Sequence, residues 1–351
     1  MTTLADVARQ AGVSPATVSR IVSGSTKSVS DELRERVLRA VEELRYVPNA
    51  HAQLLARSDR STVGVVVHDV SDPYFAEITR GLQRIATEQG KLVIICNSYR
   101  DPDRELAYVD LLRAQQAEAI ILAGSGYLDP AFTKSLGAQL AAYTATGGRV
   151  SVIGRHDLAG DAVLPANEEG GYLIASAVFA AGHREVGVIA APAELTTTAD
   201  RMSGLRRAAK EYRLAIPDER VRYASFDRDG GAQAAAELLD AVPGLTALIA
   251  MNDSMATGAL AVLRERGVPV PLAVSVVGFD DMPIAQDLTP TLTTVRLPLV
   301  EIGARALALA LDDSRGAPRH EVAAAELVLR ESLGPPRPQD SPNLSTWTDM
   351  S

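Results

Sequence analysis

From residue 62 onward, short aliphatic and β-branched runs alternate with longer amphipathic stretches, and this alternation is the feature that most limits the fold. The strand-like runs are residues 63–67, 92–96, 119–122, 149–155, 186–189, 247–250 and 274–278. The helix-like stretches are residues 74–90, 103–115, 171–181, 201–212 and 255–266, and residues 237–239 belong to a further helix. Such alternation predicts an α/β fold with parallel sheets and helices on both faces. The strands outnumber those of one usual sheet, so we expect two sub-domains.

The N-terminus follows a different pattern. An apolar stripe at helical spacing predicts a short first helix, and its members are Leu4, Val7, Ala8 and Ala11. Gly12 can end that helix in the left-handed conformation, and Ser14 followed by Pro15 favours a second helix over 15–23. Two short helices joined by a glycine turn form a helix-turn-helix, whose second helix enters the DNA major groove. On spacing alone, an ordinary helical hairpin fits equally well.

The sequence predicts three further segments after these two helices. A third helix is predicted over 30–46, with Ser30 as its cap, and it would close a three-helix headpiece. Residues 50–56 could form a helix of about two turns, which is marginal alone in water. Residues 57–61 form a polar linker.

The net charge of the chain is −9, but it is unevenly distributed. Residues 1–60 contain nine Lys or Arg and seven Asp or Glu, so the acidic excess lies in the remainder. A near-neutral to basic head on an acidic body lets only the head approach phosphates. Because the head is weakly basic, we expect dimerisation to be needed for useful DNA affinity.

Composition places the chain among ordinary globular proteins, with 46% hydrophobic residues. The sequence contains no run of about 18 apolar residues, which a membrane span would need, and no secretory signal is evident. The single cysteine, Cys96, cannot form an internal disulfide and lies in a strand-like run. We therefore expect a cytoplasmic protein without membrane contact.

The residues of the N-terminal module carry a resemblance. The relevant stretches are Leu4-Ala5-Asp6-Val7-Ala8, Ala11-Gly12-Val13-Ser14 and Thr17-Val18-Ser19-Arg20. They resemble the N-terminus of the lactose/galactose repressor family of bacterial transcription regulators, and the resemblance runs to about residue 335. It implies a helix-turn-helix headpiece and a two-lobed, periplasmic-binding-protein-like effector domain of doubly wound parallel sheets. It also implies a homodimeric repressor that binds a pseudo-palindromic operator and responds to a small, sugar-like effector between the lobes.

The resemblance also implies domain boundaries. We expect a DNA-binding headpiece over 1–47, a hinge helix and linker over 48–61, an effector domain over 62–335 and a disordered tail over 336–351. The N-lobe is expected over about 62–161 and 293–322, and the C-lobe over about 163–290 and 324–335. The chain would then cross between the lobes near 161–164, 289–293 and 321–325. No C-terminal heptad follows Pro335, which favours a dimer over a tetramer.

The resemblance assigns DNA contacts to two segments. The expected headpiece contacts are Thr3, Ser14, Pro15, Ala16, Thr17, Ser19 and Arg20, and the expected hinge contacts are Asn49, Ala52 and Leu55. Arg20 can fork onto guanine O6 and N7, although a solvated side chain or a phosphate clamp is the alternative. Leu55 stands where the family carries a Leu that wedges into the minor groove. The alternative for Leu55 is packing on its own domain.

The resemblance also assigns effector contacts by position. The expected residues are Asp72, Tyr74, Phe75, Arg155, Thr197, Arg201, Phe226, Asn252 and Asp280. Bidentate donors and acceptors between aromatic faces suit a polyhydroxylated ring. Asp72, Gly154 and Ala166 depart from the residues that the family usually carries there, which weakens a simple ribose assignment. A purine or nucleoside effector remains open.

The sequence argues against an enzyme. It contains no Walker motif, no Gly-x-Gly-x-x-Gly after a strand and no Gly-x-Ser-x-Gly elbow. The five histidines are scattered without metal-ligand spacing, so we expect neither a metal site nor a cofactor. A stand-alone sugar-binding receptor is the remaining alternative, and it would not bind operator DNA in a gel shift.

Overall fold

The computed structural model describes residues 2–22, 29–46, 61–312, 314 and 316–337. It divides into two compact units, Met1–Ser61 and Thr62–Ser351, which are described separately. The expected hinge helix, with Asn49, Ala52 and Leu55, and the expected disordered tail beyond residue 337 lie outside the described residues.

The first unit contains three helices, α1 (Leu4–Ala11), α2 (Pro15–Val22) and α3 (Asp31–Glu43). Thr3 and Asp6 form a capping box at the start of α1, and Gly12 ends α1 with a φ of 65°. Ser30 caps α3, as predicted. The three helices share a small buried core, formed by Val7, Ala8, Ala11, Val18, Ile21, Val37 and Ala40.

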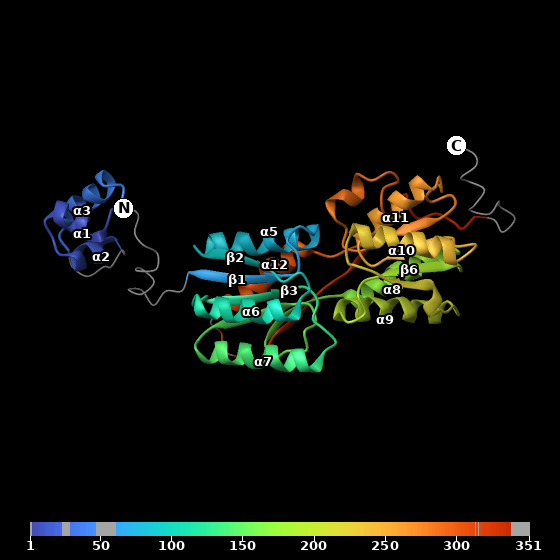
Figure 1. The fold of residues 1–351 in the computed structure, drawn as a ribbon, viewed down its shortest axis with the longest axis horizontal. Coiled ribbons are helices and arrows are strands. Elements are labelled where there is room, and N and C mark those ends of the chain that lie inside the picture. Colours follow the sequence, from blue (N-terminus) through green and yellow to red (C-terminus); the bar gives the residue numbers. More distant parts are fainter. Residues whose placement is uncertain (1, 23–28, 47–60, 313, 315, 338–351) are drawn as a thin grey trace. The chain divides into compact units, whose positions relative to one another are not determined.

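The second unit begins with a six-stranded parallel sheet, which we call the N-lobe sheet. Its strands, in spatial order, are β11 (His320–Ala323), β5 (Asp161–Pro165), β4 (Arg149–Ile153), β3 (Ala119–Ala123), β1 (Thr62–Val67) and β2 (Leu92–Asn97). Helices α5 (Pro73–Glu88) and α12 (Leu299–Leu311) cover one face, and α6 (Pro102–Ala114) and α7 (Pro130–Ala145) cover the other (Figure 1). Val65 faces the first helix layer and Val66 the second, because successive side chains of a strand alternate.

A four-stranded parallel sheet forms the second lobe, and we call it the C-lobe sheet. Its strands, in spatial order, are β7 (Val221–Tyr223), β6 (Val186–Ala190), β8 (Ala247–Ala250) and β9 (Ser275–Val277). Helices α8 (Asn167–Ala180) and α9 (Thr196–Glu211) pack as one pair, and α10 (Arg228–Ala241) and α11 (Asp253–Glu265) pack as another (Figure 1). Two short 3₁₀ helices, Asp218–Arg220 and Pro283–Gln286, complete the lobe.

The chain passes between the lobes later than we expected at two of the three places. β5 lies wholly in the N-lobe sheet, so the first passage follows Pro165 and not 161–164. β10 (Thr294–Arg296) pairs with β12 (Glu326–Val328). Thr293 bridges to Val277 of the C-lobe and Arg296 to Asp280, so the second passage follows Arg296. The third passage follows the end of β11. The two passages lie later in the chain because β5 and β10 each continue, by pairing with neighbouring strands, beyond the apolar run that the sequence shows.

Candidate functional site

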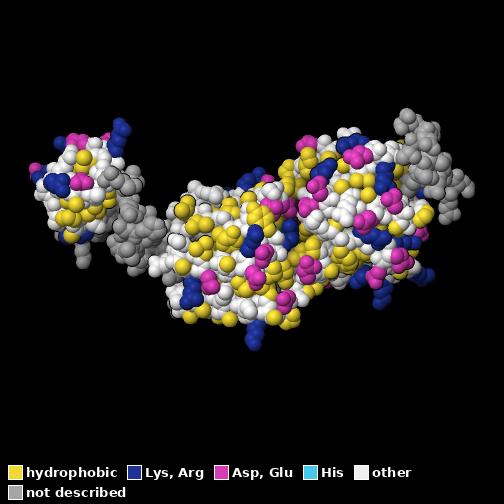
Figure 2. Space-filling view, in the orientation of Figure 1, with side chains coloured by type: hydrophobic (Ala, Val, Ile, Leu, Met, Phe, Trp, Pro, Cys, Tyr) yellow, Lys and Arg dark blue, Asp and Glu magenta, His cyan; other side chains and the backbone are white. Residues whose placement is uncertain are grey.

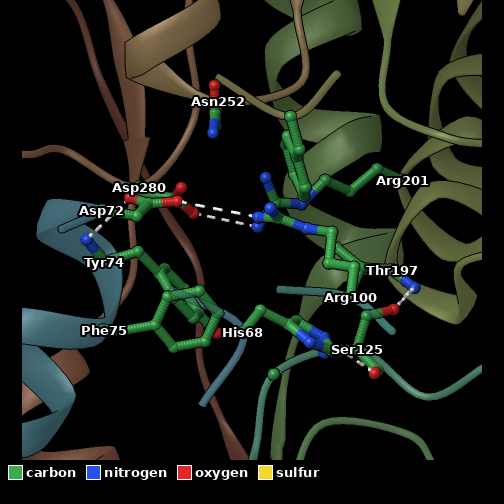
Figure 3. Close-up of a pocket in the computed structure, with 12 residues that line it drawn as sticks. His68, Asp72, Tyr74, Phe75, Arg100, Ser125, Thr197, Arg201, Asn252 and Asp280 are labelled. Carbon is green, nitrogen blue, oxygen red and sulfur yellow. Dashed lines mark hydrogen bonds and ion pairs between the residues drawn. The ribbon is translucent and has the colours of Figure 1, made fainter. Parts of the chain in front are cut away.

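The carboxyl ends of strands from both lobes meet at one pocket (Figure 3). Its lining residues are His68, Asp72, Tyr74, Phe75, Arg100, Gly124, Ser125, Thr197, Arg201, Phe226, Asn252 and Asp280. The pocket encloses about 360 Å³ of space, including its opening to solvent. This edge of open α/β sheets is the usual place for a ligand.

Helix starts place several of these side chains. Asp72 caps α5, and its Oδ1 accepts from the backbone N–H of Tyr74 at 3.1 Å. Asn252 caps α11, and its Oδ1 accepts from the backbone N–H of Met255 at 2.7 Å. The capping oxygen is therefore used in each case, whereas the Asn252 amide NH₂ remains a donor for the pocket.

Arg201 forms the most buried polar cluster of the pocket, and only 2% of it is exposed. Its Nε donates to Asn167 Oδ1 at 2.9 Å, one Nη donates to Asp280 Oδ1 at 2.9 Å, and the other donates to the carbonyl oxygen of Met251. The guanidinium also stacks over Phe279 at 3.6 Å from the ring centroid. Burial raises the pKa of Asp280, and the nearby Arg201 opposes that rise.

His68 lies on the N-lobe side of the pocket in a closed hydrogen-bond network. Its Nε2 accepts from the backbone N–H of Ser125 at 3.2 Å, and its Nδ1 lies 3.2 Å from Ser98 Oγ. Burial lowers the pKa of His68 to about 3, so the ring is neutral near pH 7. Ser125 Oγ accepts from the backbone N–H of Thr197 at 3.0 Å, which joins the two lobes beside the pocket.

Asp72 and Arg100 face each other from two N-lobe loops (Figure 3). Burial, reinforced by Asp280, raises the pKa of Asp72 to about 6. The closest approach of Arg100 to Asp72 is 3.9 Å between Nη2 and Oδ2. Arg100 also lies over the Phe226 ring at 5.4 Å from its centroid.

The structure brings together all but one of the predicted effector residues. Asp72, Tyr74, Phe75, Thr197, Arg201, Phe226, Asn252 and Asp280 line the pocket. Arg155 is not among the lining residues. Its guanidinium instead pairs with Asp200 at 2.7 Å and with Asp157 at 3.1 Å.

The sequence reasoning missed four lining residues, His68, Arg100, Gly124 and Ser125. Each follows β1, β2 or β3 within three residues, and this position after a strand was the available signal.

Gly154 stands where the family usually carries another residue, and the structure gives a physical reason for the glycine. Its φ is 97°, and a Cβ there would overlap the carbonyl oxygen of Gly124.

The headpiece presents the predicted DNA contacts on and before α2. Ser14, Pro15, Ala16 and Arg20 are exposed, and Thr17 and Ser19 are half-buried. Ser14 Oγ accepts from the backbone N–H of Thr17 at 3.1 Å, so it caps α2. Thr3 is exposed but uses its hydroxyl to cap α1.

The described part of the chain contains neither a cluster of metal ligands nor a membrane-spanning helix. No group of three or more His, Cys, Asp or Glu side chains there is arranged to hold a metal ion. Among the helices of that part, none is both long and apolar enough to cross a bilayer.

Comparison with known proteins agrees with both units. Residues 3–49 match the family described as "Bacterial regulatory proteins, lacI family", and residues 60–314 match "Periplasmic binding proteins and sugar binding domain of LacI family". The chain is 35% identical over 348 residues to the HTH-type transcriptional regulator GalR of Escherichia coli K12, which covers 96% of this chain and 97% of GalR.

Solved structures resemble the whole chain as well. A complex of the transcriptional regulator CelR with cellobiose is 30% identical, with a TM-score of 0.69, and the match covers 95% of this chain and 100% of CelR. The Lac repressor bound to ONPG is 26% identical, with a TM-score of 0.80, over 95% of this chain and 99% of the repressor. The headpiece, the two lobes and these matches together show that the chain belongs to the lacI family of bacterial DNA-binding transcriptional regulators.

Proposed function

We propose that this regulator is a repressor that binds a pseudo-palindromic operator as a homodimer and is controlled by a small, sugar-like effector. The observation that carries the proposal is the lining of the pocket between the lobes. Carboxylate and amide groups of Asp72, Asn252 and Asp280 can fix hydroxyls, while Tyr74 and Phe226 can cover the apolar faces of a ring. The relative CelR, solved with cellobiose, supports a sugar as the effector class.

In this proposal, α2 reads bases in the major groove. Pro15 and Ala16 are exposed and offer apolar contact, for instance to a thymine methyl group. Arg20 forks onto guanine, and Thr17 and Ser19 bind phosphates. Leu55 of the hinge wedges into the minor groove, and effector binding changes whether the two hinge helices of a dimer form together.

A homodimer gives each half of the operator its own headpiece. The effector domain offers a surface for this pairing at β2, the edge strand of the N-lobe sheet. Leu92 is 65% exposed and Ile95 is 40% exposed on this strand. Figure 2 shows hydrophobic side chains gathered over the part of this lobe that carries α5 and β2. We propose that a second copy covers this edge.

A purine or nucleoside is the second candidate effector. Tyr74 and Phe226 could stack a base as well as a sugar, and a PurR repressor of Escherichia coli is 31% identical over 338 residues. A thermal-shift screen with sugars and nucleosides distinguishes the two classes, because a ligand raises the melting temperature of the native state that binds it.

In vitro selection of DNA from a random pool tests the repressor proposal. We expect an inverted repeat to be enriched, with binding that weakens steeply as salt increases. Arg20→Ala should relax the preference at one base pair of each half-site, worth about 1–3 kcal/mol. Arg9→Ala, at an exposed position on α1, is the matched control for loss of charge. If no repeat is enriched at low ionic strength, the proposal is wrong.

A further inference from the structure

A strained turn presents Arg100 to the pocket. β2 ends at Asn97, and the next turn places Tyr99 at φ 54° and Arg100 at φ 58° before Asp101 caps α6. Two successive non-glycine residues in the left-handed region are strained, and such strain clusters at ligand sites. The turn brings the Arg100 guanidinium over the ring of Phe226, which belongs to the opposite lobe.

The two arginines of the pocket differ in how their hydrogen-bond donors are used. All three nitrogens of Arg201 donate to protein acceptors within the C-lobe. Arg100 Nε is buried without a hydrogen-bond partner, and its 3.9 Å approach to Asp72 is too long for a hydrogen bond. Only 21% of the Arg100 side chain is exposed, so water replaces few of these missing bonds. Arg201 is therefore satisfied by the protein, whereas Arg100 is not.

The carboxylates near Arg100 make no hydrogen bond to its Nε. Asp280 is committed to Arg201, and Asp72 uses Oδ1 to cap α5. The starts of α5, α9 and α11 also contribute lining residues, and helix N-termini favour negative charge. Burial lowers the pKa of Arg100, and the nearby carboxylates of Asp72, Asp69 and Asp227 oppose that shift.

We propose that the effector is a sugar acid or sugar phosphate whose anionic group docks on Arg100, and that Arg100 selects it over the neutral sugar. The inference rests on the proposed function, and it narrows the effector from any sugar-like molecule to an anionic sugar derivative. Arg100 offers parallel N–H donors that match carboxylate and phosphate oxygens. A neutral hydroxyl would accept one of these bonds but would add no negative charge beside the buried guanidinium.

Isothermal titration calorimetry on the full chain tests this proposal with matched ligands. The probes are D-glucose, D-glucuronate and D-glucose 6-phosphate, with the same three forms of D-galactose. We expect at least one anionic form to bind at least tenfold more tightly than its neutral sugar. Whether the uronate or the phosphate binds more tightly identifies the anionic group.

A variant pair assigns the preference to Arg100. Arg100→Gln should reduce the affinity for the anionic probe at least tenfold and leave that for the neutral sugar within about threefold. Arg113→Gln is the control, because Arg113 is exposed on α6 and does not line the pocket. Thermal unfolding of each variant shows whether it is folded.

Three results would overturn the inference. They are equal or tighter binding of the neutral sugars, an unchanged preference in Arg100→Gln, and binding of none of the anionic probes. The DNA selection described above is read without any ligand. A chain that still enriches an inverted repeat therefore remains a regulator even when this inference fails.

Discussion

Arg201 and Asp280 form a buried ion pair on the C-lobe side of the pocket. The pair is almost fully buried, and Arg201 also anchors Asn167 and the carbonyl oxygen of Met251. A buried ion pair contributes little net stability, but removal of one partner leaves an uncompensated charge. The pair therefore holds the C-lobe side of the pocket in one arrangement before any ligand binds.

Arg201→Met should lower the free energy of unfolding by about 3–5 kcal/mol, because Asp280 is left buried and unpaired. The double variant Arg201→Met, Asp280→Asn should recover part of that loss. Urea denaturation followed by circular dichroism measures both. Strict additivity of the two single variants would contradict this account, since residues in contact are expected to couple.

Asp72 makes stability depend on pH. Its pKa is raised to about 6 in the folded protein, so the unfolded chain releases this proton more readily. The protonated form is favoured by folding, and its stabilising effect is complete below about pH 4 and is lost as pH rises through 6. Asp72→Asn keeps a capping oxygen and removes the titration. We expect the variant to match the natural protein near pH 4 and to exceed it by up to about 3 kcal/mol at pH 7.

Thermal or urea unfolding of the two proteins between pH 4 and pH 7 measures this difference. Asp129→Asn is the control for exchanging a cap, because Asp129 caps α7 at an exposed position. A constant difference across the pH range would show that Asp72 does not titrate in this window.

Site residues were predictable from sequence where a strand end alone places them. Asn252 and Asp280 follow buried runs and lie in the pocket for that reason. Arg155 also follows a strand, but Asp200, 45 residues later, takes up its guanidinium. Arg100 depends on the backbone conformation at Tyr99 and at its own position, which composition does not reveal. Pairing between charges far apart in the sequence and the conformation of turns therefore could not be predicted from the sequence.

At the scale of elements, the backbones of α5 and α12 lie too close together for any side chain at their point of contact. A Cβ at Gly81 would overlap the carbonyl oxygen of Val300, and one at Gly303 would overlap that of Ile78. Each helix thus offers a glycine to the backbone of the other. This close crossing ties α12, which follows the second passage between the lobes, to the first helix of the N-lobe.

Gly81→Ala should destabilise the N-lobe by more than 1 kcal/mol, although alanine is the better helix former, because the backbones must separate. Gly137→Ala on α7 is the matched control, since its Cβ would meet only Leu158 Cδ2 at 3.5 Å. That control should be neutral or stabilising by up to about 1 kcal/mol. Unfolding midpoints in urea measure both changes. Equal effects of the two substitutions would refute the role of the close crossing.

The elements that the sequence revealed are those with a clear period or a clear cap. The helices of the headpiece begin and end at Thr3, Gly12 and Ser30, close to their predicted bounds. Helices α7 and α12 were missed, and α12 is apolar on most of its surface because it is buried on several sides. β10 and β12 contain three residues each, too few for any alternation to be recognised.

At the scale of the whole molecule, two units have separate cores. The change from helical to alternating pattern near residue 62 predicted this division, and the structure divides the chain at Ser61. The headpiece core consists mainly of valine and alanine, whereas the effector domain has large, continuous cores. Small domains bury a smaller fraction of their surface and are correspondingly less stable.

We therefore expect two thermal transitions in differential scanning calorimetry, with the headpiece unfolding first. Val37→Ala should lower only the first transition, by about 4–8 °C for each kcal/mol lost, because Val37 is fully buried in the headpiece. Ile121→Val, in the N-lobe sheet, should lower only the second. A chain of residues 62–351 should retain the second transition and the response to the anionic probes but lose DNA binding. If Val37→Ala moved both transitions together, the two units would unfold as one cooperative body, and their separation would be wrong.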